Sequence, residues 1–161
     1  MKKFLSITFL CAVFLGISQI FVSAAPERMQ DNSIEVYFND PFDENQDRSI
    51  QLMILDAIEN AESQIDIATY NFTDTRSRDA LIQAMNRGVE VRIVIHSENS
   101  DKDVLRTLEN RGAEIQKSRS DGLMHSKFIV IDQDITISGS ANMTPGSFFY
   151  DNNFMIMKLL S

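Results

Sequence analysis

The chain has 161 residues, of which 43% are hydrophobic, so it is long enough for one compact domain with its own core. Its 23 acidic residues outnumber its 15 basic ones, and the resulting net charge of −8 counts against a broad nucleic-acid-binding surface, although not against a local positive pocket. The single cysteine, Cys11, excludes an internal disulfide bond and a zinc site built from several cysteines.

Residues 1–24 are predicted to be a secretory signal peptide. Lys2 and Lys3 precede an uncharged, mostly apolar run at residues 4–22, and small residues follow it. The alternative is an N-terminal membrane anchor, because the run is long enough to span a bilayer. Cleavage would export residues 25–161 to the periplasm or the medium as the folded domain. It would also leave 13 basic against 23 acidic residues, a net charge of −10.

Strand and helix patterns alternate after this segment. Continuous or alternating apolar residues predict strands, and apolar residues spaced three or four apart predict helices. The predicted strands cover residues 34–38, 64–72, 89–95 and 113–115, and the predicted helices cover residues 49–62, 76–86 and 101–111. Strand and helix alternate three times, which favours an α/β fold with a largely parallel sheet flanked by helices.

A β-hairpin is predicted next. Residues 128–131 form a β-branched and aromatic run, and residues 135–138 alternate isoleucine with a hydroxyl residue. Gln133 and Asp134 are predicted to supply the turn between the two arms. One further strand is predicted at residues 154–161. The antiparallel hairpin makes the predicted sheet a mixed one.

Polar residues stand at both outer ends of this hairpin. His125 and Lys127 open the first arm, and Gly139, Ser140 and Asn142 close the second. Antiparallel pairing brings both outer ends to the same edge of the sheet, so an imidazole, an ammonium, a hydroxyl and an amide converge there. A phosphate diester requires such groups, namely a nucleophile for phosphorus and donors for the non-bridging oxygens. The pattern therefore predicts a phosphodiester site.

The spacing of these residues is similar to the signature of the phospholipase D superfamily. The pattern His-x-Lys, four residues, Asp, six residues, Gly-Ser-x-Asn is matched at every specified position by His125, Lys127, Asp132, Gly139, Ser140 and Asn142. Residues 65–72, 80–93 and 124–128 also resemble the small single-motif members, which include bacterial secreted endonucleases and cardiolipin hydrolases. The resemblance implies a phospholipase D-like fold and a phosphodiesterase that needs no cofactor and no metal.

The resemblance also implies roles for the motif residues. His125 would attack phosphorus and form a phosphohistidine, and Lys127 and Asn142 would bind the phosphate oxygens. Ser140 would be a supporting hydroxyl or a further donor to the same oxygens. Asp132 lies a strand length away from the site and is expected to be structural, holding the turn by hydrogen bonds or an ion pair.

This mechanism needs a second group that protonates the leaving alkoxide and later activates water. In the family a second motif histidine has that role, whereas the only other histidine here is His96, which has no motif around it. His96 is a possible site residue, because it ends a buried strand, where α/β proteins often place functional groups, and an ordinary strand-end residue is the alternative. We therefore expect a homodimer in which each chain contributes its His125 at a two-fold axis. Family members also carry an orienting carboxylate about a dozen residues after the motif, a place that Asp151 or Asn153 would take.

The motif binds only the phosphate, so the substrate is left open. A nuclease-like phosphodiesterase is the leading expectation. Phospholipase D action on phospholipid head groups is the alternative, favoured by the acidic charge and the predicted export. A catalytically weak binding module is a third, because the C-terminal helix that the family uses to cover its sheet has no counterpart in the sequence.

Overall fold

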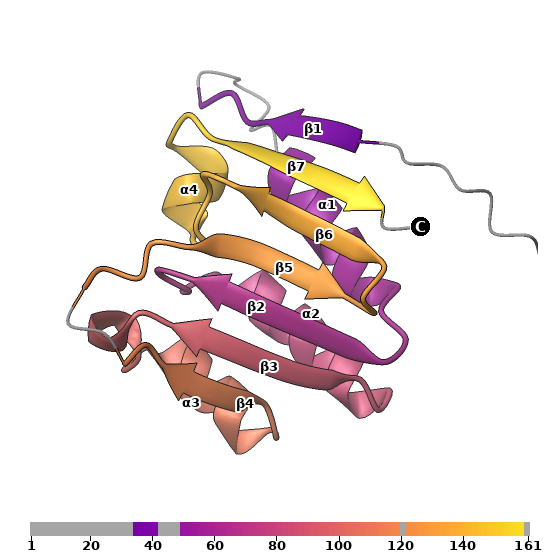
Figure 1. Ribbon diagram of the computed structural model, residues 1–161, viewed down its shortest axis with the longest axis vertical. Helices are drawn as coiled ribbons and strands as arrows, with labels where there is room; N and C mark the ends of the chain where they lie inside the picture. The colour runs from indigo at the N-terminus through magenta and orange to yellow at the C-terminus, as the bar shows by residue number, and fades with distance from the viewer. Residues whose placement is uncertain (1–33, 42–48, 120–121, 160–161) are drawn as a thin grey trace, which may run out of the picture.

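The computed structural model describes residues 34–41, 49–119 and 122–159, which form a seven-stranded sheet with helices packed on one of its faces (Figure 1). The predicted signal peptide lies outside the described residues. The described elements, in chain order, are β1 (Ile34–Phe38), α1 (Ser49–Glu59), β2 (Gln64–Thr69), α2 (Thr75–Asn86), β3 (Glu90–Ile95), the 3₁₀ turn η1 (Ser97–Asn99), α3 (Asp103–Asn110), β4 (Glu114–Lys117), β5 (Lys127–Ile131), β6 (Ile135–Gly139), α4 (Pro145–Phe149) and β7 (Phe154–Leu159).

The strand order across the sheet is β1-β7-β6-β5-β2-β3-β4. Pairing is parallel between β2 and β3 and between β3 and β4, and antiparallel in the other four pairs. The mixed α/β sheet is thus confirmed, but antiparallel pairs outnumber parallel ones, and the expectation of a largely parallel sheet was wrong in this respect. The reason is that β1 and β7 add two antiparallel pairs outside the hairpin.

The core lies between the sheet and the helices α1, α2 and α3, which all cover the same face (Figure 1). Isoleucines spaced four residues apart on α1, namely Ile50, Ile54 and Ile58, are at most 1% exposed. They pack with inward-facing side chains of the central strands, such as Ile65 and Ile93. Burying a large aliphatic side chain contributes roughly 1.5–3 kcal/mol, so this apolar stripe holds the helices to the sheet.

The opposite face of the sheet is not covered by any described helix (Figure 1). Strand register aligns one row of side chains straight across this open face, and the row consists of Val36, Ile156, Ser138, Phe128, Ala68 and Val94. The four large apolar members of the row are between 37% and 48% exposed. An apolar strip of this kind is uncommon on a free surface.

Two details of the C-terminal half differ from the prediction. The hairpin turn is centred on Asp132 and Gln133, with φ of 53° and 64°, one residue earlier than predicted. Two consecutive left-handed residues give a type I′ turn, whose twist matches that of the two strands. The short helix α4, capped by Thr144, was not predicted, because its Pro-Gly-Ser start is typical of a loop.

Within the described residues, no helix combines the length and the apolar character needed to cross a bilayer.

Candidate active site

Both outer ends of the β5–β6 hairpin lie at one edge of the sheet, where β2 and β3 also end (Figure 1). Lys127, the first residue of β5, pairs with Thr69 at the end of β2, and Phe128 pairs with Ser138 near the end of β6. The segments before β5 and after β6 therefore leave the sheet side by side, as the hairpin pattern predicted. We call this the motif edge.

His125 and Lys127 occupy different environments at the motif edge. His125 is exposed in the loop that leads into β5. Lys127 is only 8% exposed, and its Nζ donates a hydrogen bond to the main-chain oxygen of His125 at 3.0 Å. Burial lowers the pKa of the Lys127 ammonium. An accessible imidazole thus stands beside a partly desolvated cation, which attracts a phosphate oxygen more strongly than a cation in bulk water does.

Tyr70 connects His125 to His96. Its ring lies edge-on to the His125 imidazole, with 5.2 Å between the ring centroids, and stacks on the His96 imidazole at 5.1 Å. The Lys127 Nζ lies 5.8 Å from the centroid of the same ring. His96, which directly follows β3, is 6% exposed. The structure therefore brings His96, a possible site residue in the sequence, next to Tyr70, and only the contact through this ring was not predicted.

Asn142 has a counterpart in Asn71. Phe72 and Met143 form a parallel bridge, so the residue before each of them, Asn71 and Asn142, holds a matching place at the motif edge. The side-chain oxygens of these two asparagines are buried without a hydrogen-bond partner in the described part of the chain. Buried amide oxygens normally accept a hydrogen bond within the protein, so this pair retains the capacity to accept from a donor of a ligand.

The Ser140 hydroxyl makes its hydrogen bonds within the protein rather than towards the open side of the site. Its hydroxyl donates to Asn153 Oδ1 at 2.7 Å and accepts from the Phe154 N–H at 3.1 Å. Asn153 in turn donates from Nδ2 to the Ser147 oxygen at 2.9 Å. Asn153 is therefore held between Ser140 and Ser147, whereas Asp151 is exposed and uses its main chain in hydrogen bonds. That one of the two replaces the family's orienting carboxylate stays a prediction.

Comparison with known proteins identifies the family of the chain. Residues 54–159 match the family model described as "Cardiolipin synthase, PLD-like domain". The chain belongs to the phospholipase D-like family.

Relatives in this family carry different names. The phospholipase D of Rickettsia prowazekii is 36% identical over 93 residues, which cover 56% of this chain and 45% of the relative. The mitochondrial cardiolipin hydrolase of Chlamydomonas reinhardtii is 30% identical over 95 residues, which cover 56% of this chain and 41% of the relative. The matched region thus spans less than half the length of these relatives.

Solved structures agree on the fold. The phospholipase D family member Nuc from Salmonella typhimurium superposes with a TM-score of 0.68 at 24% identity, covering 79% of this chain and 82% of that one. NucT from Helicobacter pylori gives a TM-score of 0.65 at 19% identity, covering 78% and 86%. At these identities the likeness establishes the phospholipase D fold and leaves the substrate open.

The motif aspartate, Asp132, lies at the opposite end of the hairpin from the other motif residues. Its carboxylate accepts from the N–H groups of Glu62, Ser63 and Gln64 at 2.8 to 2.9 Å and from the Ser63 hydroxyl at 2.8 Å. Burial alone would raise the pKa of this carboxyl, but these hydrogen bonds outweigh it and lower the pKa to about 2. Asp132 thus joins the turn to the start of β2 through hydrogen bonds.

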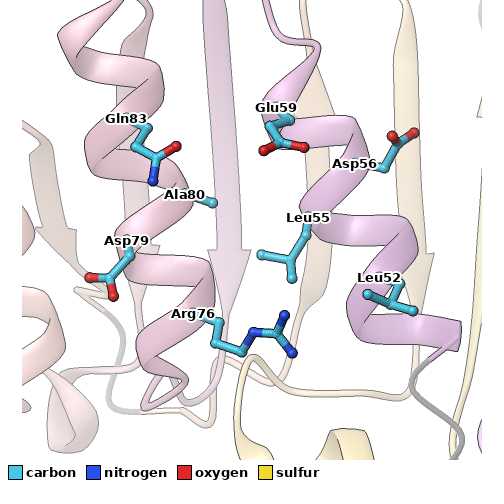
Figure 2. Close-up of a pocket in the computed structure, with 8 residues that line it drawn as sticks. All are labelled: Leu52, Leu55, Asp56, Glu59, Arg76, Asp79, Ala80 and Gln83. Atoms are coloured by element: carbon cyan, nitrogen blue, oxygen red, sulfur yellow. The ribbon is translucent and has the colours of Figure 1, made fainter.

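A larger groove lies on the helical side, between α1 and α2, and Figure 2 shows the side chains that line it. It has a volume of about 580 Å³ and is lined by Leu52, Leu55, Asp56, Glu59, Arg76, Asp79, Ala80 and Gln83. Three carboxylates against one guanidinium disfavour a phosphate there. None of the motif residues lines it, so we keep the motif edge as the candidate site of this phospholipase D-like chain. Among the described residues, no three metal-ligating side chains gather in one place.

Replacing Asn153 with aspartate tests whether a family-like carboxylate suits this position. We expect Asn153→Asp to lower the free energy of unfolding by about 1–3 kcal/mol, because the amide donor to the Ser147 oxygen is lost and a carboxylate oxygen then faces that carbonyl. Urea denaturation measures the change. Asp151→Asn is the matched control on an exposed residue, and we expect it to leave stability nearly unchanged. An Asn153→Asp variant as stable as the parent would contradict this account.

Proposed function

We propose that this chain is a phosphodiesterase that works through a phosphohistidine formed on His125, with a nuclease-like specificity. The observation that carries the proposal is the contrast at the motif edge, where an exposed imidazole lies beside the buried ammonium of Lys127. Imidazole is a suitable nucleophile because its neutral form is populated near pH 7.

The first step would form a bond between His125 and phosphorus while the bond from phosphorus to one ester oxygen breaks. Lys127 and Asn142 would stabilise the negative charge that builds up on the non-bridging oxygens. An acid must protonate the departing alkoxide. Water then displaces the imidazole from phosphorus and releases a phosphomonoester, which restores His125.

The activity is tested by incubating the full chain, in EDTA, with plasmid DNA, with bis(p-nitrophenyl) phosphate and with cardiolipin vesicles. We expect cleavage of the first two substrates without added metal. Failure to cleave any of the three would overturn the proposal. Cleavage of the vesicle lipid alone would replace the nuclease-like specificity with the lipid one.

Phospholipid hydrolysis is the second candidate, and the open sheet face favours it. Phe128 follows Lys127 directly on β5 and is 41% exposed, while Phe154, at the start of β7, is 40% exposed. Both aromatic side chains belong to the open face and lie near the motif edge. Apolar surface next to a phosphate site suits a substrate that carries acyl chains.

We further propose that the active unit is a homodimer. His125 lies exposed in its loop, so the site is open to solvent on the side of its nucleophile. His96 is buried against Tyr70, which suits packing better than proton transfer to a substrate beside the exposed His125. A second copy facing the motif edge would supply both the missing acid and the missing wall.

Mixing wild-type chains with an inactive variant tests this assembly. If two copies of His125 share each site, a roughly ninefold excess of His125→Ala chains should lower the activity per wild-type chain to about one tenth, because few wild-type chains would then pair with each other. The mixture must be equilibrated through dilution and reconcentration before the assay. Undiminished activity, with a monomer mass in sedimentation at the assay concentration, would refute the homodimer.

A further inference from the structure

The ring of Tyr70 contacts two histidine side chains, those of His96 and His125. It stacks on His96 with an interplanar angle of 24° and a centroid separation of 5.1 Å, and it meets His125 edge-on at 65° and 5.2 Å. The main chain of Tyr70 is also fixed, because its carbonyl oxygen accepts from Asn99 Nδ2 at 2.9 Å. The position of this ring is therefore determined by β2, β3 and the turn that follows β3.

His96 also contacts the main chain of the segment that carries His125. Its Nδ1 accepts a hydrogen bond from the main-chain N–H of Met124 at 3.4 Å, and Met124 directly precedes His125. Accepting at Nδ1 places the proton of the neutral imidazole on Nε2, which lies 3.9 Å from a carboxylate oxygen of Glu98. His96 thus contacts both the ring beside the His125 imidazole and the chain that carries it.

We propose that Tyr70 and His96 are positioning residues for His125, an inference that rests on the proposed function. His125 is exposed and lies outside any strand, so its own segment restrains its imidazole little. Attack on phosphorus requires the reacting nitrogen close to its target and in line with the leaving oxygen, and a displacement of about 1 Å can cost about 100-fold in rate. The Tyr70 ring limits where the imidazole can turn, and His96 fixes both that ring and Met124.

A positioning role separates the expected effects on binding and on turnover. Tyr70→Met keeps an apolar side chain of comparable length but removes the ring, and we expect it to lower kcat about 10- to 100-fold on bis(p-nitrophenyl) phosphate with little change in KM. Tyr70→Phe retains the ring and should keep kcat within about threefold of the parent. His96→Phe retains the stacked ring but loses the acceptor for Met124, so it should give an intermediate loss.

Nuclear magnetic resonance supplies a readout that does not depend on activity. The chain contains two histidines, so its spectrum has two imidazole Hε1 signals, which His96→Phe and His125→Ala assign. Because an aromatic ring shifts the resonances of nearby protons, Tyr70→Met should move the His125 signal, whereas Tyr70→Phe should leave it near its original place. Circular dichroism confirms that each variant is folded.

The two proposals can fail separately. A folded parent chain that hydrolyses no diester, but whose His125 signal responds to Tyr70→Met, would overturn the proposed function and leave the contact between the two residues intact. A Tyr70→Met variant with unchanged kcat and an unmoved His125 signal would overturn the positioning role. If Tyr70→Met does not fold, His96→Phe decides the matter, because parental kcat and an unmoved His125 signal in that variant would also overturn it.

Discussion

Replacing His125 with alanine is expected to lower phosphodiester hydrolysis by at least about 1000-fold, because the variant has no group to form the bond to phosphorus. The side chain is exposed and outside the core, so the loss should come without a change in the unfolding midpoint. Initial rates on bis(p-nitrophenyl) phosphate measure the effect. Ser126→Ala, on the exposed neighbour, is the matched control and should retain parental activity.

The covalent step can be tested on the same pair of chains. Mass spectrometry of the parent chain, quenched in alkali during turnover, should show a phosphoryl adduct on a peptide that contains His125. Alkali is required because phosphohistidine is labile in acid. Activity of His125→Ala above about one thousandth of the parental rate would contradict the nucleophile assignment, and so would an adduct found only elsewhere in the chain.

Replacing Asp132 with alanine is expected to give the largest loss of stability among the motif residues. The carboxylate accepts hydrogen bonds from the main chain at Glu62, Ser63 and Gln64, so its removal frees several donors at once. Asp132 also has a φ of 53°, a conformation that aspartate tolerates better than alanine does. We expect the free energy of unfolding to fall by about 2–4 kcal/mol, measured by urea denaturation. Asp132→Asn keeps the shape and should lose about half as much.

The pH dependence of stability provides a second test of the role of Asp132. The pKa of Asp132 lies near 2 in the folded chain, below its ordinary value of 3.8. The stabilisation is therefore fully present above about pH 5 and disappears as the pH falls towards 2. Since solvent screens this partly exposed carboxylate, we expect it to account for about 1–2 kcal/mol of the stability lost over that interval. The loss should be smaller by that amount in Asp132→Asn.

The catalytic effect should differ sharply from the effect on stability. Asp132 lies five residues along β5 from Lys127, a separation of about 17 Å at the usual rise per residue. Under conditions where Asp132→Asn is fully folded, its kcat should match that of the parent. A large fall in kcat in the folded variant would contradict the structural role.

The hairpin and the motif were predictable because both depend on the sequence of neighbouring residues along the chain. The alternation at residues 135–138 and the spacing from His125 to Asn142 are visible in the chain itself, and the register then places both ends at one edge. The turn was misplaced by one residue because left-handed residues other than glycine, such as Gln133, carry little sequence signal.

The contacts that complete the candidate site were not predictable in the same way. Tyr70 meets His96 and His125 only because β2 lies between β3 and β5, and no spacing along the chain encodes that meeting. The same holds for Ser140 and Asn153, whose pairing depends on the path of the chain through α4. Such contacts follow from the strand order, which propensity and periodicity do not determine.

The pairing of β1 with β7 has a consequence for how the chain reaches this structure. These strands are aligned from Ile34 opposite Lys158 to Phe38 opposite Phe154, so one edge of the sheet joins segments more than a hundred residues apart. Closing so long a loop costs conformational entropy before the contacts between the two strands can form, and contacts between residues far apart in the sequence slow folding. We expect β1 to join the sheet last, after α1–α3 and the hairpin have collapsed together. During synthesis, the apolar side chains of β1 would then stay unpaired until β7 has left the ribosome.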